Sequence, residues 1–152
     1  MARKNSTSNF YDKPERIHHE LGLIDFGAGA DVVHSIQVPK DKFGGTGKRG
    51  RVRGVLISQI AEDFVGSTSD AGVQIGDGTD PDKYFNSGLV LDETYDVADL
   101  TCWILENDDS EGGVGANVVD IEAGRSFVTV TNKVSVGSPA GQAHVTVIID
   151  WY

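Results

Sequence analysis

Three carboxylates within one short stretch have the spacing that is most typical of metal chemistry. Asp77, Asp80 and Asp82 lie in the run Asp77-Gly78-Thr79-Asp80-Pro81-Asp82, and several oxygen ligands close together suit a hard cation such as calcium. The run is not an EF-hand loop, because glycine is not at its sixth position and no glutamate follows at its twelfth. Turns rich in aspartate commonly satisfy their own backbone instead. We therefore expect a turn that binds no cofactor, with a metal site at these three aspartates as the alternative.

No other motif predicts catalysis. The loop Gly44–Arg49 resembles a phosphate-binding loop, but Lys42 stands where the first glycine is needed and Arg49 replaces the serine or threonine that holds magnesium. The four histidines show neither the H-x-H nor the H-E-x-x-H spacing of a metal centre. Cys102, the single cysteine, shares one strand face with Ala98, Leu100 and Ile104, which predicts a small buried hydrophobe on an apolar face. We therefore expect no enzyme activity.

Basic residues gather in one segment of an otherwise acidic chain. The chain carries a net charge of −10. The segment Lys40–Arg53 holds six basic residues and one acid, whereas Gly54–Tyr152 holds three basic residues and 17 acids. Such an asymmetry predicts a molecule that docks one face onto a negatively charged partner, although solvated loop charges are the alternative. The docking candidates are Arg3, Lys4, Lys42, Lys48, Arg49, Arg51 and Arg53. The overall acidity argues against a nucleic-acid partner.

The elements that must position these residues are predicted to be strands. The chain has 18 valines and 10 isoleucines but only 7 leucines, and side chains branched at Cβ favour pleated sheets over helices. Apolar residues repeat every second position in several runs, most clearly over 142–151, as in antiparallel strands with one buried face. Glycine-rich turns separate these runs. We therefore predict an all-β antiparallel β-sandwich of about eight strands, with a jelly roll as the best-known arrangement.

The first residues are predicted to be a polar arm. Residues 1–20 lack a sustained apolar period, and a short helical turn is possible over Pro14–Leu21 with Gly22 as its cap. The sandwich domain is then expected to span residues 21–152. No stretch approaches the roughly 20 apolar residues of a membrane span, and no secretory signal is evident at the start. The lone cysteine is typical of a protein folded in a reducing cytoplasm.

Large aromatic residues near the end of the chain are candidates for contacts between subunits. Trp103 lies on the strand face opposite Cys102, and Trp151 and Tyr152 close the last run. Aromatic side chains are enriched in protein interfaces. We therefore expect Trp103, Trp151 and Tyr152 to contact a neighbouring subunit, the alternative being that the fold itself covers them.

Three segments together resemble the small decoration, or cement, proteins of tailed-phage heads. They are Gly50–Val55, Val73–Tyr84 with its D-P-D-x-Y ending, and the closing alternating run Gly141–Tyr152. The resemblance covers roughly residues 32–152 and is a pattern of strands and turns without a residue-level functional motif. It implies a jelly-roll homotrimer that binds the major capsid protein and bridges neighbouring capsomers of an icosahedral shell.

The function expected from this resemblance is therefore structural. The protein would be made in the cytoplasm of a host bacterium and would end on the outer surface of the virion. A phage head fibre or a receptor-binding module that recognises host glycans is the alternative. Such a module is expected to carry an aromatic and Asn/Asp-rich cleft.

Overall fold

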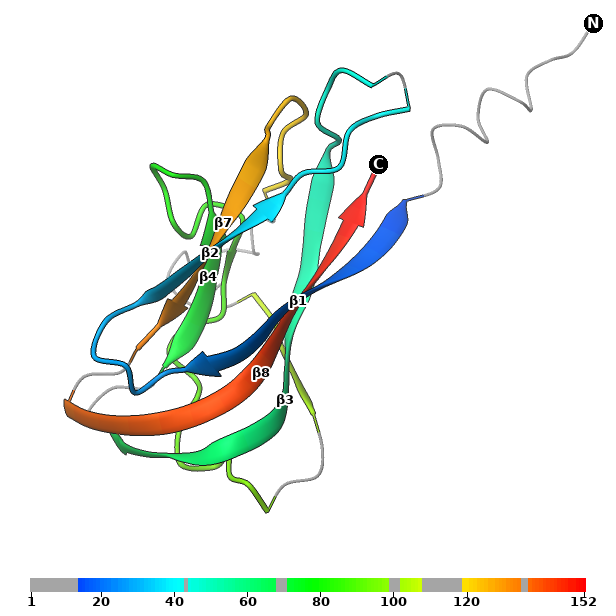
Figure 1. The fold of residues 1–152 in the computed structure, drawn as a ribbon. Coiled ribbons are helices and arrows are strands. Elements are labelled where there is room, and N and C mark those ends of the chain that lie inside the picture. The colour runs from blue at the N-terminus through cyan, green and yellow to red at the C-terminus, as the bar shows by residue number, and fades with distance from the viewer. Residues whose placement is uncertain (1–13, 43, 68–70, 99–101, 108–118, 135–136) are drawn as a thin grey trace, which may run out of the picture.

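The described residues form eight strands, which build two four-stranded antiparallel sheets (Figure 1). The computed structural model describes residues 14–42, 44–67, 71–98, 102–107, 119–134 and 137–152. The strands are β1 (Glu15–Asp25), β2 (Val32–Gln37), β3 (Gly50–Ser67), β4 (Gly72–Gly76), β5 (Phe85–Asn86), β6 (Trp103–Leu105), β7 (Phe127–Lys133) and β8 (Gly137–Trp151). Sheet A has the order β1-β8-β3-β6, and sheet B has the order β2-β7-β4-β5. No helix long and apolar enough to cross a membrane occurs in this described part of the chain.

The strand pairs define a jelly roll. Each strand of the first half pairs with its counterpart from the second half: β1 with β8, β2 with β7, β3 with β6 and β4 with β5. The chain is therefore one long hairpin with its tip between β4 and β5. Wrapping this hairpin adds the pairs β3–β8 and β4–β7, which complete the two sheets. The predicted fold class is confirmed.

The core lies between the two sheets, and β8 contributes its most regular row. Alternate residues of β8 are completely inaccessible to solvent: Ala143, Val145, Val147, Ile149 and Trp151. Valines and isoleucines of β3, β4 and β7 complete the same cluster. The alternation that the sequence shows over 142–151 therefore does mark a strand with one buried face.

The first strand corrects the prediction for residues 1–20. Residues 15–25 form β1, which pairs with β8 over its whole length, so the helical turn predicted over Pro14–Leu21 is wrong. Residues 15–20 belong to the sandwich, and residues 1–13 lie outside the described residues. The register of β1 against β8 shifts between Glu20 and Gly22. Gly22 has a φ of 83°, which is typical of a bulge rather than a helix cap.

The short strand β6 corrects the predicted burial of Cys102. Cys102 is exposed, and the neighbouring Ile104 is 59% exposed on the outside of sheet A. Trp103 and Leu105 face the core instead. A backbone neighbour explains this arrangement, since a Cβ atom at Gly54 would lie only 2.9 Å from Cγ2 of Ile104. The absence of a side chain at Gly54 gives Ile104 room on the outer face.

Candidate functional site

Four arginines from β1, from β3 and from the residue before β3 surround two aspartates at one end of sheet A, where β8 lies between β1 and β3. We call this group the arginine surface: Arg16, Arg49, Arg51 and Arg53, with Asp120 and Asp150 beneath them. Arg16 lies on β1 and Asp150 on β8, directly opposite one another in the register. On the other side of β8, Arg51 of β3 is the residue paired with Asp150 in the strand register. Sheet order therefore brings together charges that are far apart in the sequence.

Asp150 is the first centre of the arginine surface. Its side chain is only 4% exposed, and Arg16 grips it with two bonds: Nε donates to Oδ1 at 2.7 Å and Nη2 to Oδ2 at 3.0 Å. Arg53 donates from Nε to Oδ2 at 2.6 Å. Arg53 can do so because the register of β3 shifts between Val52 and Gly54, which places Arg53 in a bulge. A fork of two parallel bonds to a carboxylate is the strongest geometry that arginine offers.

Asp120 is the second centre. Arg51 donates from Nε to Oδ1 at 2.7 Å, Arg49 from Nη2 to Oδ2 at 3.2 Å, and the Tyr152 hydroxyl to Oδ2 at 2.8 Å. The next residue, Ile121, exchanges two backbone hydrogen bonds with Gly50 at 2.8 and 3.1 Å. The start of β3 therefore holds the segment that carries Asp120 in place.

Both aspartates are held in their ionised form. The hydrogen bond from Arg16 is the main cause that lowers the pKa of Asp150 to about 2, and Arg53 adds to it against the effect of burial. The hydrogen bond from Arg51 lowers the pKa of Asp120. Opposite charges and hydrogen bonds to the charged form both favour ionisation. The two carboxylates therefore stay negative through the physiological range.

The arginine surface presents positive charge to the solvent. The four arginine side chains are 42–57% exposed, whereas those of Asp120 and Asp150 are 16% and 4% exposed. Four guanidinium groups thus lie above two carboxylates, and each keeps N–H donors that form no bond with another described residue. Arginine forks of this kind match carboxylate and phosphate groups. Lys48 extends the surface and forms a 3.3 Å ion pair with Glu15.

The structure brings most of the predicted docking residues together. Lys48, Arg49, Arg51 and Arg53 share this end of the molecule, and Lys42 lies exposed in the loop before them. Arg3 and Lys4 lie outside the described residues. Arg16 was missed, because the sequence placed it in the arm rather than in a strand. The sequence did contain one signal for it: Ile17 faces the core, so its neighbour Arg16 faces outward on β1.

Trp151 is not an interface residue, which corrects the prediction. Its side chain is completely buried, and its Nε1 donates to Nε2 of His19 at 3.1 Å. A Cβ atom at Gly50 would lie 2.6 Å from the indole ring, so only glycine fits opposite it. Trp151 follows the inward alternation of β8 and belongs to the core.

The other two aromatic candidates differ in their surroundings. Trp103 is half-buried, and its ring packs at 4.8 Å from that of Tyr95. Tyr152 is 40% exposed and borders the arginine surface, where the Arg49 guanidinium lies 5.8 Å from the ring centroid. Tyr152 therefore remains open to a partner, whereas Trp103 is largely covered by its own fold.

The aspartate run at 77–82 forms a turn that satisfies itself. Oδ1 of Asp77 accepts the backbone N–H groups of Thr79 and Asp80, both at 2.9 Å, and Oδ2 lies 2.8 Å from Nη2 of Arg125. The Asp80 N–H is the main cause that lowers the pKa of Asp77 to about 2. Across the described residues, no three His, Cys, Asp or Glu side chains are gathered to hold a metal ion. The geometry favours the turn over the alternative metal site at Asp77, Asp80 and Asp82.

A second polar cluster, not expected from the sequence, anchors the segment before β7. Glu122 accepts hydrogen bonds from Lys83 at 2.5 Å, from the Tyr84 hydroxyl at 2.5 Å and from Arg125 Nε at 2.7 Å. Burial, followed by the bond to Glu122, raises the pKa of Tyr84 to about 12. The Lys83 and Arg125 charges lie 5.4 and 5.7 Å from the Tyr84 ring centroid. Every polar member is paired, so the cluster serves structure.

Comparison with known proteins yields no relative. No family model, no curated protein and no solved structure matches this chain. A functional proposal must therefore rest on the jelly-roll fold, on the arginine surface and on the sequence resemblance.

Proposed function

We propose that the protein is a structural component of a phage virion, which decorates an icosahedral capsid as a homotrimer and strengthens it by bridging capsomers. The three segments that resemble decoration proteins fall on the jelly-roll framework. Gly50–Val55 begins β3, Val73–Tyr84 covers most of β4 and the turn into β5, and Gly141–Tyr152 covers most of β8. Their resemblance is therefore one of framework, and it supports a shared architecture.

The arginine surface is the observation that carries the docking part of the proposal. The chain as a whole has a net charge of −10, so a positive surface at one end gives it an orientation toward a negative partner. The buried aspartates fix the guanidinium groups in place before any partner arrives. This preorganisation lowers the entropy cost of binding. A capsid surface that presents carboxylates fits this arrangement.

The outer face of sheet B supports association of several copies. Its outward side chains along β2, β4, β5 and β7 are uncharged up to Lys133, which forms a 2.7 Å ion pair with Asp31. They are Val33, Ser35, Gln37, Gln74, Asn86, Phe127, Thr129 and Thr131. Val33 is 59% and Phe127 51% exposed. Acidic chains can approach one another through such a face without repulsion between like charges.

Charge reversal at Arg49 tests the docking part. Arg49 contributes only the longest bond to Asp120, so we expect Arg49→Glu to keep the fold. Exposed ion pairs contribute about 0.5 kcal/mol each, and three copies per trimer raise the loss to about 1.5 kcal/mol, or roughly tenfold in affinity. Cosedimentation with capsids that lack this protein measures this loss. Binding by the wild type should also weaken as salt is raised.

A matched charge reversal is the control for this experiment. Lys133→Glu also reverses one charge and removes one ion pair, but it lies on sheet B, away from the arginine surface. Because Lys133 borders the outer face of sheet B, light scattering first checks that this variant is still a trimer, and we then expect its cosedimentation to be unchanged. Equal losses for both variants, or no loss for Arg49→Glu, would reject the arginine surface as the docking site. Glycan binding without any capsid binding would favour the receptor-binding alternative.

Light scattering tests the homotrimer. We expect a mass three times the 16.2 kDa of one chain. Phe127→Glu places a charge on the outer face of sheet B and should release monomers, whereas Ile104→Glu on sheet A should not. A monomeric wild type at micromolar concentration contradicts the trimer. Dissociation by Ile104→Glu alone would place the interface on sheet A instead.

A further inference from the structure

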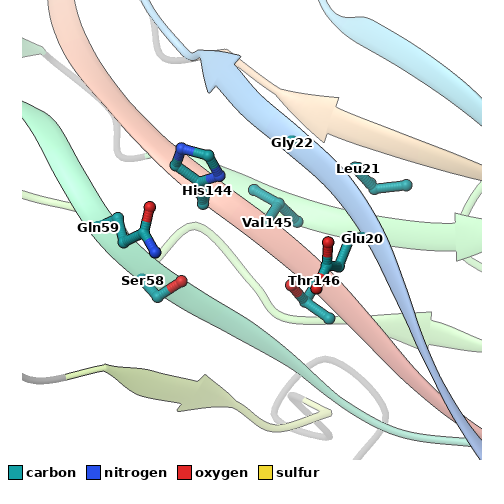
Figure 2. Close-up of a pocket in the computed structure, with 8 residues that line it drawn as sticks. All are labelled: Glu20, Leu21, Gly22, Ser58, Gln59, His144, Val145 and Thr146. Carbon is teal, nitrogen blue, oxygen red and sulfur yellow. The ribbon is translucent and has the colours of Figure 1, made fainter.

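A polar groove of about 480 Å³ crosses the outer face of sheet A, toward the opposite end of β8 from Asp150. Figure 2 shows that its lining comes from three strands that lie side by side, β1, β8 and β3. The lining residues are Glu20, Leu21, Gly22, Ser58, Gln59, His144, Val145 and Thr146. This volume lies within the range of about 300–1,000 Å³ that is typical of small-molecule sites.

Two irregular strands make the groove. On one side of β8, the register of β1 shifts between Glu20 and Gly22, and on the other side the register of β3 shifts after Ser58. A Cβ atom built on Gly22 would meet nothing within 4 Å, so the space above it is open. Regular strands at these positions would present a flat, pleated surface. The coincidence of two bulges at one level of β8 hollows the sheet instead.

Backbone strain marks the same place. Gln59 has a φ of 49° and, within the described residues, is the one residue other than glycine with a positive φ. A side chain in the left-handed region costs about 1–2 kcal/mol. Such strain persists where the surrounding structure holds it, and it is concentrated at functional sites. At Gln59 the strained backbone carries an exposed amide beside the groove.

The polar side chains of the groove have unused hydrogen-bonding capacity. Glu20, Ser58, Gln59, His144 and Thr146 form no side-chain hydrogen bond or ion pair with another described residue. At the other end of the same face, by contrast, Asp150 is satisfied by two arginines. One carboxylate, one amide, one imidazole and two hydroxyl groups therefore face the groove with donors and acceptors unpaired.

The combination of groups selects the chemistry of a ligand. The lining contains no lysine or arginine, so it offers no strong partner for phosphate or sulfate. Among the described residues it belongs to no cluster able to hold a metal ion. Donors and acceptors are mixed along the groove, whereas the Leu21 side chain packs against the core. A neutral molecule with several adjacent hydroxyl groups matches such a lining.

We propose that this groove is a saccharide-binding subsite. The Glu20 carboxylate accepts bonds from sugar hydroxyl groups, and the Gln59 amide and the two hydroxyl side chains both donate and accept. The site is independent of the arginine surface, and a protein attached to a capsid could use it to hold glycans.

Titration of the ¹⁵N-labelled protein with neutral monosaccharides tests the proposal. The probes are methyl α-glucoside, methyl β-galactoside and N-acetylglucosamine at millimolar concentrations. With at least one of them we expect saturable amide shifts confined to residues 20–22, 58–59 and 144–146. Gln59→Ala and Glu20→Gln should each weaken this binding at least fivefold while the remaining spectrum stays native. The exposed Gln37 on sheet B provides the matched control, and Gln37→Ala should leave binding unchanged.

The possible outcomes separate this proposal from the proposed function. No saturable shift with any of the three saccharides would overturn the saccharide subsite, as would binding that both groove variants leave intact. Stronger shifts at the same residues with lysine methyl ester would show a cation site and also overturn it. We expect Glu20→Gln to cosediment with capsids like the wild type, because Glu20 forms no bond with the arginine surface. Loss of saccharide binding and loss of capsid binding are therefore distinguishable.

Discussion

The hydrogen-bonded carboxylate of Asp150 provides the sharpest test of the arginine surface as a preorganised unit. Asp150→Asn keeps the shape of the side chain and removes its charge. Arg16 and Arg53 then lose the anion that holds them 2.7 and 2.6 Å away. We expect the variant to fold, because the inward-facing neighbours Ile149 and Trp151 are unchanged.

The magnitude follows from the pKa of Asp150. The arginines lower that pKa from 3.8 to about 2, and each unit corresponds to about 1.4 kcal/mol, which gives about 2.5 kcal/mol in total. The arginine side chains are 57% and 47% exposed, so solvent screening reduces this to about 1 kcal/mol. Asp150→Asn should therefore lower the free energy of unfolding at neutral pH by about 1 kcal/mol.

The pH dependence has a definite sign. The folded pKa of Asp150 is depressed, so its stabilisation is fully present above about pH 4 and is lost as the pH falls through about 2. At pH 2 about half of the wild-type carboxyl groups are neutral, like the amide that replaces them. The difference in unfolding free energy between wild type and Asp150→Asn should thus be largest at neutral pH and become small toward pH 2.

Urea denaturation followed by tryptophan fluorescence measures this difference, because Trp151 is buried in the native state. Glu15→Gln is the control, since it removes a 3.3 Å ion pair whose glutamate is 60% exposed. We expect less than about 0.5 kcal/mol from the control at any pH. A loss for Asp150→Asn that is equal at pH 7 and pH 2 would refute the electrostatic reasoning and leave a packing effect.

Three further predictions concern single residues. Gln59→Gly should stabilise the protein by about 0.5–1 kcal/mol, because it relieves the positive φ, whereas Gln37→Gly within the extended strand β2 should destabilise it by a similar amount, both measured by urea denaturation. The exposed thiol of Cys102 should react fully with a thiol reagent in the native protein, and protection until unfolding would contradict its placement. A spectrophotometric titration should contain a tyrosine step near pKa 12, which Tyr84→Phe removes and Glu122→Gln shifts downward; a step that survives Tyr84→Phe belongs to another tyrosine.

The sequence predicts the sandwich well where strands are long and regular. In β8 every inward position is apolar, so the period of two is clear without any structure. The first strand was not predicted, because its bulge at Gly22 shifts the alternation of inward and outward residues midway. Ile17 and Leu21, before the bulge, therefore differ in phase from Ile24 and Phe26, and the spacing of four between the first two resembles a helix.

Short strands are harder to predict from the sequence. The strand β6 has three residues, which is too few to define a period, and apolar residues occur on both of its faces. The inward side is decided by Tyr95, which packs on Trp103, and by Gly54, whose missing side chain leaves room for Ile104 on the outer face. Neither contact can be derived from the local sequence, so the burial predicted for Cys102 was wrong.

The same distinction between local and long-range information applies to the candidate site. Clustering in the sequence was enough to identify Arg49, Arg51 and Arg53 as one basic group. Their anionic partners were not predictable, because Asp120 lies 69 residues from Arg51 and Asp150 lies 97 residues from Arg53. Only the strand order β1-β8-β3 brings these groups together. Isolated charge counts therefore overstate the free positive charge of this segment.

The last strand connects the two surfaces that this structure presents. Its inward residues fill the core, and its outward residues His144, Thr146, Ile148 and Asp150 follow one line across sheet A. At about 3.3 Å per residue, His144 and Asp150 lie about 20 Å apart along the strand. The groove and the arginine surface thus share one rigid element, although no side chain of the groove bonds to the arginine surface. Substitutions at one end should leave the other end intact. The packed strand holds both ends in place, and charge interactions are screened by salt over that distance.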